Sequence, residues 1–190
     1  MKKLLQRQNW PEIAVLVTVV AMVVLLRREG QPWWCNCGRW WPWTLDAYSS
    51  HTSQHLIDPY SLTHLQHGLV LFWVVGWAVP KWKWPWKCWL AITLEAGWEL
   101  FENSKMIIDR YREATAALGY NGDSVINSLG DILCCYAGVL IAKKLGWRKT
   151  WLLSAGIELT LLLTIRDSLL LNILMLTVDT PALKAWQAGG

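Results

Sequence analysis

The stretch "AVLVTVVAMVVLL" (residues 14–26) contains no charged residue and decides the class of fold. An apolar run that follows basic residues is typical of a helix entering a membrane. The run has no small-residue cleavage site, so we expect an uncleaved first span. The whole chain of 190 residues is 54% hydrophobic, which is too apolar for an ordinary soluble domain.

Similar apolar segments recur near residues 11–27, 65–80, 86–102, 124–142 and 150–178. Helix is expected for each, because an open strand leaves backbone groups unpaired in lipid. We predict an all-α fold, a polytopic membrane helix bundle with five or six transmembrane segments, forming a single integral membrane domain over 1–190. "RDS" (166–168) interrupts the last segment, so 168–178 is either a sixth, short span or a re-entrant segment.

Basic residues near the span ends predict the orientation, since cytoplasmic loops carry an excess of Lys and Arg. Three groups indicate a cytoplasmic N-terminus and two cytoplasmic links: Lys2, Lys3 and Arg7; Lys81, Lys83 and Lys87; Lys143, Lys144, Arg148 and Lys149. The links 28–63 and 103–122 then face outward, although the second also holds bases. The net charge of +4 therefore indicates topology and not a nucleic-acid partner.

Tryptophan is unusually frequent, with 16 residues gathered mainly in "WWCNCGRWWPW" (33–43) and "PKWKWPWKCW" (80–89). Tryptophan favours the membrane–water interface, so we expect contacts with membrane lipids. An aromatic ligand cage and a contact with a membrane-protein partner are the alternatives for these Trp-rich loops.

All four histidines lie in "HTSQHLIDPYSLTHLQHG" (51–68). "THLQ" (63–66) fits a capping box that starts the second span, with Thr63 as N-cap. His64 and His67 then share one helix face at the outer end of this span. His51 and His55, spaced four apart, form either a short helix that covers the site or a pair of surface histidines.

Other spans bring polar residues to the same depth. These are Glu95, Glu99 and Glu102 on the third span, Asp123, Asn127 and Asp131 on the fourth, and Arg166 and Asp167 at the break in the last. Each acid within a membrane helix costs a few kcal/mol on insertion scales. Their convergence predicts a polar site buried in the outer half of the bundle.

A mixed nitrogen and oxygen site of this composition suits zinc, iron or manganese. The candidate ligands are His64, His67, Glu99, Glu102 and Asp131. No Glu-x-x-His motif occurs, so the match to di-iron bundles is only an analogy. A polar core neutralised by Arg166 or Arg110, and a proton or ion path, are the alternatives.

A metal-bound water could attack an ester, amide or phosphoester of a lipid or lipid-linked substrate. Glu99 is our candidate general base, and Glu95 and Asp123 are further catalytic candidates. The candidates for binding a headgroup are Arg110, Arg112, Asn127 and Arg166. A non-catalytic accessory or assembly subunit is the second hypothesis. An ion or metal carrier is the third, and the apolar inner halves of the second and fourth spans count against it.

The cysteines fall into two groups. Cys35 and Cys37 in "CNCG" lie on the outer side, where metal binding and redox activity both remain open, because a disulfide two residues apart is strained. A single C-x-C without a second pair is weak evidence for a metal site. Cys88, Cys134 and Cys135 are expected to be small buried thiols.

The blocks "CNCG", "SQHLIDPYSLTHLQHG", "WELFENSKMIIDRYR", "GYNGDSVINSLGD" and "RDSLLLNILML" together resemble an uncharacterised family of small bacterial multipass inner-membrane proteins, a domain of unknown function. The resemblance implies a location in the bacterial inner membrane and no established activity. "GDSVINSLGD" (122–131) is more distantly similar to a segment of VanZ-like membrane proteins. The Trp-rich loops are richer in tryptophan than the family pattern.

Overall fold

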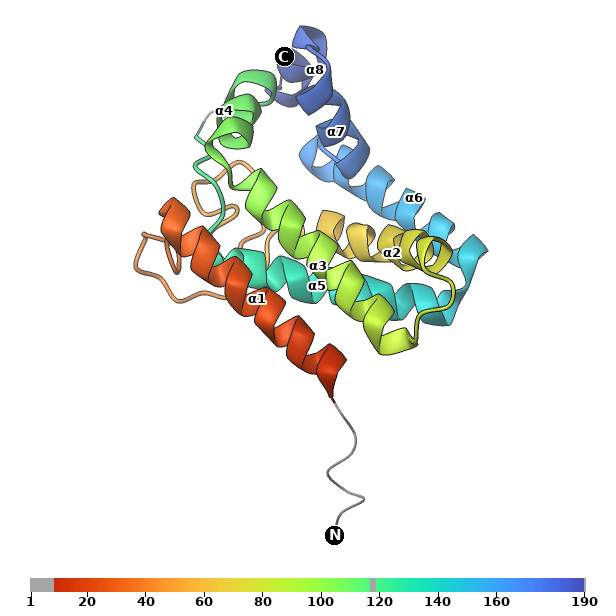
Figure 1. The fold of residues 1–190 in the computed structure, drawn as a ribbon. Helices are drawn as coiled ribbons and strands as arrows, with labels where there is room; N and C mark the ends of the chain where they lie inside the picture. Colours follow the sequence, from red (N-terminus) through yellow and green to blue (C-terminus); the bar gives the residue numbers. More distant parts are fainter. Residues whose placement is uncertain (1–8, 117–118, 190) are drawn as a thin grey trace.

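The computed structural model describes residues 9–116 and 119–189, and every regular element in these ranges is a helix (Figure 1). The helices are α1 (Trp10–Glu29), α2 (Ser61–Ala78), α3 (Trp84–Glu102), α4 (Lys105–Ala114), α5 (Val125–Leu145), α6 (Trp147–Ile165), α7 (Leu169–Thr177) and α8 (Pro181–Gln187). The all-α prediction is therefore confirmed. Lys2, Lys3 and Arg7, on which part of the predicted orientation rests, lie outside the described residues.

Among the described residues, fewer helices than the predicted five or six qualify as membrane spans by length and hydropathy. Two helices, α1 and α5, are long and apolar enough to cross a membrane, and α6 with α7 makes a third candidate if the bent pair is one span. Helices α2 and α3 are too polar to count as candidate spans, because they carry the histidines and glutamates of the polar site. The apolar helices support membrane association, and the count of five or six is not confirmed.

The C-terminal segment breaks at the predicted place. Arg166 adopts a left-handed conformation with φ 52°, and the axes of α6 and α7 differ by 72°. Helix α7 has 9 residues, about 14 Å at 1.5 Å per residue, which is far short of a hydrocarbon core of about 30 Å. Residues 168–178 are therefore not a complete sixth span, and the pair forms either one broken span or a re-entrant loop.

Helix α5 is the centre of the bundle and contacts α1, α2, α3 and α6. Its side chains join all three apolar clusters: Val125 and Ile132 pack with α1 and α3, Val139 packs with α2 and α3, and Ala142 packs with α2 and α6. In Figure 1, α1 lies beside α3 along one edge of the bundle, and α7 and α8 lie at the end where α4 also packs.

Glycines allow α2 and α5 to approach each other closely. A Cβ atom at Gly68 would lie 1.9 Å from the carbonyl oxygen of Cys135, and one at Gly138 would lie 2.0 Å from that of Leu65. Small residues at such crossings let helix backbones pack tightly in membranes, where the hydrophobic effect does not drive association. This contact fixes the position of α2, and so of its histidines, against the centre of the bundle.

We predict that Gly68→Ala lowers the free energy of unfolding by about 1–3 kcal/mol, because the new methyl group overlaps a backbone carbonyl. Gly76→Ala on the same helix is the matched control, since a Cβ there meets nothing within 4 Å. Thermal unfolding in detergent measures both. Equal melting temperatures for the two variants would contradict the close α2–α5 contact.

Candidate metal centre

Two histidines from α2 face one glutamate from α3. His64 Nδ1 lies 2.7 Å from Glu95 Oε1, and His67 Nδ1 lies 3.0 Å from both oxygens of the same carboxylate. The spacing of three residues puts both rings on one face of α2, as the sequence predicts. Glu95 is buried, whereas the side chain of His67 is 15% exposed and its ring meets the edge of Trp98.

Glu99 lies one turn further along α3 and is fully buried. Neither of its carboxylate oxygens accepts a hydrogen bond from the described residues. The nearest basic atom is His64 Nδ1, 3.2 Å from Oε1, but that nitrogen is already 2.7 Å from Glu95. One N–H group cannot serve both carboxylates well, so Glu99 is a buried acid that lacks a donor of its own.

Negative groups outnumber positive ones around His64. Six carboxyl groups lie close enough to interact electrostatically with this ring: Asp58, Glu95, Glu99, Glu102, Asp123 and Asp131. Within the described ranges, no Lys or Arg forms an ion pair with any of them. Two imidazoles are too few to neutralise this set, so the missing positive charge comes from protons on the carboxyls or from a bound cation.

Asp131 and Asp58 support the start of α2. Asp131 Oδ2 lies 3.8 Å from His64 Nε2, and its Oδ1 accepts a hydrogen bond from Ser61 Oγ. The Asp58 carboxylate accepts backbone hydrogen bonds from Ser53, Tyr60 and Ser61 at 2.7–3.1 Å. Burial raises the pKa of Asp58, and the hydrogen bond from the backbone N–H of Ser53 opposes this shift.

The predicted capping box is wrong, because α2 begins at Ser61 and Thr63 lies inside it. The Thr63 hydroxyl donates to the Tyr60 carbonyl, and Gln66 donates to Ser154 and Glu158 on α6. Asp58 instead accepts the free N–H groups at the helix start. In the sequence, the feature that marks this helix start is an Asp directly ahead of a proline. The nearby Thr-x-x-Gln pattern matches a better-known capping signal and points to a different start.

Glu102 and Asp123 lie at the far edge of the acidic group. Glu102 Oε1 accepts a hydrogen bond from Tyr111 on α4, at 3.0 Å, and its other oxygen meets no hydrogen-bond donor at bonding distance within residues 9–116 and 119–189. Asp123 accepts from Asn103 and Tyr120, both at 3.0 Å. Burial raises the pKa of Asp123, and the hydrogen bond from Asn103 opposes this shift. Asp123 thus lies outside the His–Glu contact. No hydrogen bond or ion pair among the described residues joins Asp123 directly to His64 or His67, so none supports its predicted catalytic role.

The four residues proposed to bind a headgroup make contacts within the protein. Arg110 donates to the carbonyls of Met175 and Leu176 at the end of α7, and Arg166 donates to the Trp186 carbonyl. Arg112 contacts Tyr120 and Asn121. Asn127 is buried and donates to the His55 carbonyl. None of the three arginines forms an ion pair with the six carboxyls, so the described contacts do not support neutralisation by Arg110 or Arg166.

Two groupings of the bundle residues have the geometry of a metal site. One holds His64, His67 and Glu95, and the other holds His64, Glu99 and Glu102. In each, one potential ligand atom per residue lies within 4.8 Å of the others. Glu95 is thus a candidate ligand that the sequence assigned only to catalysis. Sequence reasoning missed Tyr111 and helix α4, although "MIIDRYREA" (106–114) has the apolar spacing of an amphipathic helix.

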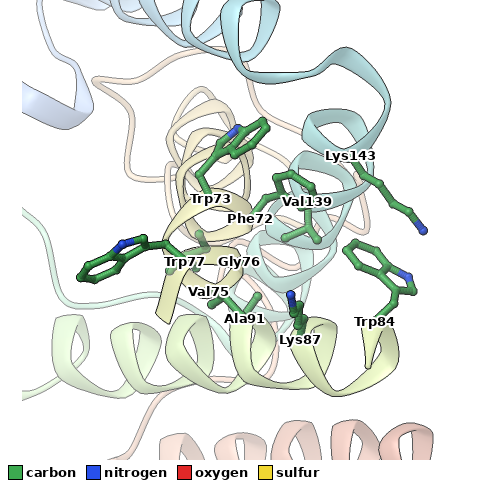
Figure 2. Close-up of a pocket in the computed structure, with 11 residues that line it drawn as sticks. Phe72, Trp73, Val75, Gly76, Trp77, Trp84, Lys87, Ala91, Val139 and Lys143 are labelled. Carbon is green, nitrogen blue, oxygen red and sulfur yellow. The ribbon is translucent and has the colours of Figure 1, made fainter. Parts of the chain in front are cut away.

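The opposite end of α2, α3 and α5 is apolar. A cavity of about 440 Å³ there is lined by Phe72, Val75, Trp84, Ala91 and Val139, with two lysines, Lys87 and Lys143. Figure 2 shows Phe72 and Val139 facing this space, with Lys143 extending beside Trp84. The Lys143 ammonium lies 3.9 Å from the centre of the Trp84 ring. The polar groups of the site therefore do not continue into this cavity.

We predict that Asp58→Ala destabilises the protein by about 1–3 kcal/mol, because the buried Ser53 N–H and the part-buried Tyr60 N–H lose their acceptor, and the Ser61 N–H keeps only the residue 58 carbonyl. Asp46→Ala is the control, since Asp46 accepts a backbone hydrogen bond in the same loop but is exposed; a change within about 0.5 kcal/mol is expected there. Thermal unfolding in detergent measures both variants. An Asp58→Ala protein as stable as Asp46→Ala would show that Asp58 does not hold the start of α2.

Comparison with known proteins identifies relatives over nearly the whole chain. The family described as "Protein of unknown function (DUF2585)" matches residues 26–189. A UPF0314 protein of Sphingopyxis alaskensis is 42% identical over 98% of both chains. A UPF0314 protein of Sinorhizobium fredii is 40% identical over 97% of this chain and 94% of its own. No solved structure matches. These findings confirm the resemblance to an uncharacterised bacterial family, and the distant likeness to VanZ-like proteins is not shown.

Proposed function

This chain belongs to the DUF2585 family, and on the geometry of its polar cluster we propose that it is a membrane metalloenzyme that hydrolyses a lipid or lipid-linked substrate. The ligands are His64, His67 and Glu95, and the ion is divalent, with zinc the best fit and iron or manganese the alternatives. The observation that carries the proposal is the fully buried Glu99 carboxylate beside this ligand set, to which no described residue donates a hydrogen bond.

The distances within the ligand set are those of direct hydrogen bonds, and they also lie close to the spacing that a bound ion needs. Ligand atoms about 2 Å from a tetrahedral zinc lie about 3.3 Å from one another. The contacts of His64 and His67 with Glu95, at 2.7–3.0 Å, need only a small expansion to reach that spacing. Two histidines and one glutamate are also a set that catalytic zinc sites use, with a fourth position open to water.

A divalent ion in this position would supply a Lewis acid and lower the pKa of a bound water. Glu99 is the proposed general base, because its free carboxylate lies 3.2 Å from the ligand His64. Asp131 lies on the other side of the ring, 3.8 Å from His64 Nε2, where a small shift would let it orient His64 as carboxylates behind metal-bound histidines do. Glu102 accepts a hydrogen bond from Tyr111 and lies at the edge of the acidic group. Together with His64 and Glu99, it forms the alternative ligand set.

The substrate is proposed to enter from the lipid side. His67 is the ligand with the most exposed side chain, and Trp98 beside it presents an aromatic edge between α2 and α3. We propose that the protein is a multipass protein of the bacterial inner membrane, with its N-terminus in the cytoplasm and this site facing the periplasm. The charge bias of the loops supports that orientation.

A non-catalytic accessory role has one observation in its favour. Trp33, Trp40, Trp41 and Trp43 are 58–78% exposed in the loop before α2. Such aromatic surfaces suit either the membrane interface or a membrane-protein partner. The carrier hypothesis gains no support, because none of the described residues that line the cavity at the other end of the helices is an acid.

We predict that the His67→Ala, Glu95→Gln double variant, purified in mild detergent, binds about one equivalent of metal less than the wild-type protein, as measured by elemental mass spectrometry. Glu158→Gln is the matched control: it removes a half-buried glutamate on α6, which accepts a hydrogen bond from Gln66 and lies outside the ligand set. Unchanged metal content in the double variant, with only lower stability, would leave a structural polar core and refute the metal site.

The catalytic role of Glu99 has a separate test. Glu99→Gln keeps the ligand set and is expected to retain the metal, while hydrolysis falls by about 10²–10⁴-fold because the base is lost. The assay uses vesicles of bacterial phospholipids and measures release of fatty acid or headgroup phosphate. A variant as active as the wild type would remove Glu99 from the mechanism, and an inactive wild type that holds the metal would favour the accessory role.

A further inference from the structure

A second group of metal-binding side chains lies in the loop between α1 and α2, outside the helix bundle site. It consists of Cys35, Cys37, His51 and His55, and one potential ligand atom from each lies within 4.8 Å of the others. Cys35 Sγ is 3.4 Å from His51 Nδ1, and the rings of His51 and His55 are 5.5 Å apart. The second pair that the C-x-C motif lacks in the sequence is therefore a pair of histidines.

We propose that these four residues form a closed, tetrahedral zinc site. Two thiolates and two imidazoles are a full ligand set of the kind that structural zinc uses, with no position left for substrate. The site is distinct in chemistry from the His–Glu cluster, because its sulfur ligands select thiophilic ions. The proposal does not depend on the function proposed for the bundle site.

Hydrogen bonds to the ligands support the assignment. His55 is buried, and its Nδ1 lies 2.6 Å from the Trp41 carbonyl oxygen, which can only accept. Nδ1 therefore carries the proton, and Nε2 is left with its lone pair for a metal. A metal-bound histidine is typically oriented through its other nitrogen in this way. Cys37 Sγ accepts a hydrogen bond from the Arg39 backbone N–H at 3.4 Å, which favours a thiolate.

The backbone of the loop explains how these residues meet. Gly38 has φ 74°, which turns the chain directly after Cys37. Ser53 has φ 62°, so residues 51–55 form a tight turn and not the short helix that their spacing suggested. Both cysteines are free thiols, and a disulfide between residues two apart would be strained. A hollow of about 320 Å³, lined in part by Arg39, Trp43, His51 and His55, gives an ion access from outside.

The position of the site gives it a structural task. Both arms of the loop hold the start of α5: the Pro32 and Trp33 carbonyls accept from Val125 and Ile126, and the Ser53 carbonyl accepts from Ser124. A zinc ion between residues 35–37 and 51–55 would join these arms and close the loop. Closing a loop of this length removes conformational freedom from the unfolded chain, so the ion stabilises the covering of α5 and of the α2 start.

Cobalt substitution of the purified full-length protein tests the proposal, because thiolate ligands give cobalt(II) an intense charge-transfer absorption. We expect this absorption in the wild type, in Cys134→Ser and in the His67→Ala, Glu95→Gln double variant. We expect this absorption to be lost in the loop double variant, Cys35→Ser, Cys37→Ser. Cys134 is the matched control, since it is a partly buried cysteine on α5, outside the loop. Zinc content should fall by one equivalent in the loop double variant and stay unchanged in Cys134→Ser.

The zinc measurement is made on folded protein, with circular dichroism confirming the helix content of each variant. Loss of zinc from a loop double variant that keeps its helices supports the site. A zinc content unaffected by Cys35→Ser, Cys37→Ser, or a Cys35–Cys37 disulfide found by mass spectrometry in the purified wild type, would overturn it.

Discussion

The contact between two imidazoles of α2 and the acids of α3 is the interaction on which the rest of the structure depends. Among the described residues, His64 and His67 are the only basic side chains whose nitrogens lie at 2.7–3.2 Å from the carboxylates of Glu95 and Glu99. The close crossing at Gly68 and Gly138 holds α2 against α5, and Asp58 and Ser61 fix its first turn. The apolar clusters thus hold polar groups together at one end of the bundle. Burying these polar groups is unfavourable by itself, so stability alone does not explain their position.

Much of the fold and of the site follows from the sequence. Helical spacing placed His64 and His67 on one face and aligned Glu95 with Glu99, and the alternating direction of the spans brought those faces to one end. These inferences hold because a helix fixes the relation between residues three or four apart. The break at 166–168 could also be predicted, since charged residues interrupt an apolar run there.

The rest depends on contacts that spacing does not encode. The start of α2 lies two residues before the predicted N-cap because Asp58, in the preceding loop, accepts its free N–H groups. Whether an arginine faces a carboxylate or a carbonyl depends on which segment packs nearby, and Arg110 meets the end of α7. The pairing of Cys35 and Cys37 with His51 and His55 joins residues across a loop without regular structure, where no periodicity exists to reveal it.

An anomalous-difference map from crystals of the wild-type protein, recorded on both sides of the zinc absorption edge, tests most directly whether an ion sits between α2 and α3. We predict a peak about 2 Å from nitrogen atoms of His64 and His67 and from an oxygen of Glu95, with the Glu99 carboxylate beside it. Density that shows His67 hydrogen-bonded directly to Glu95, with no peak between them in metal-replete protein, would contradict the metal centre.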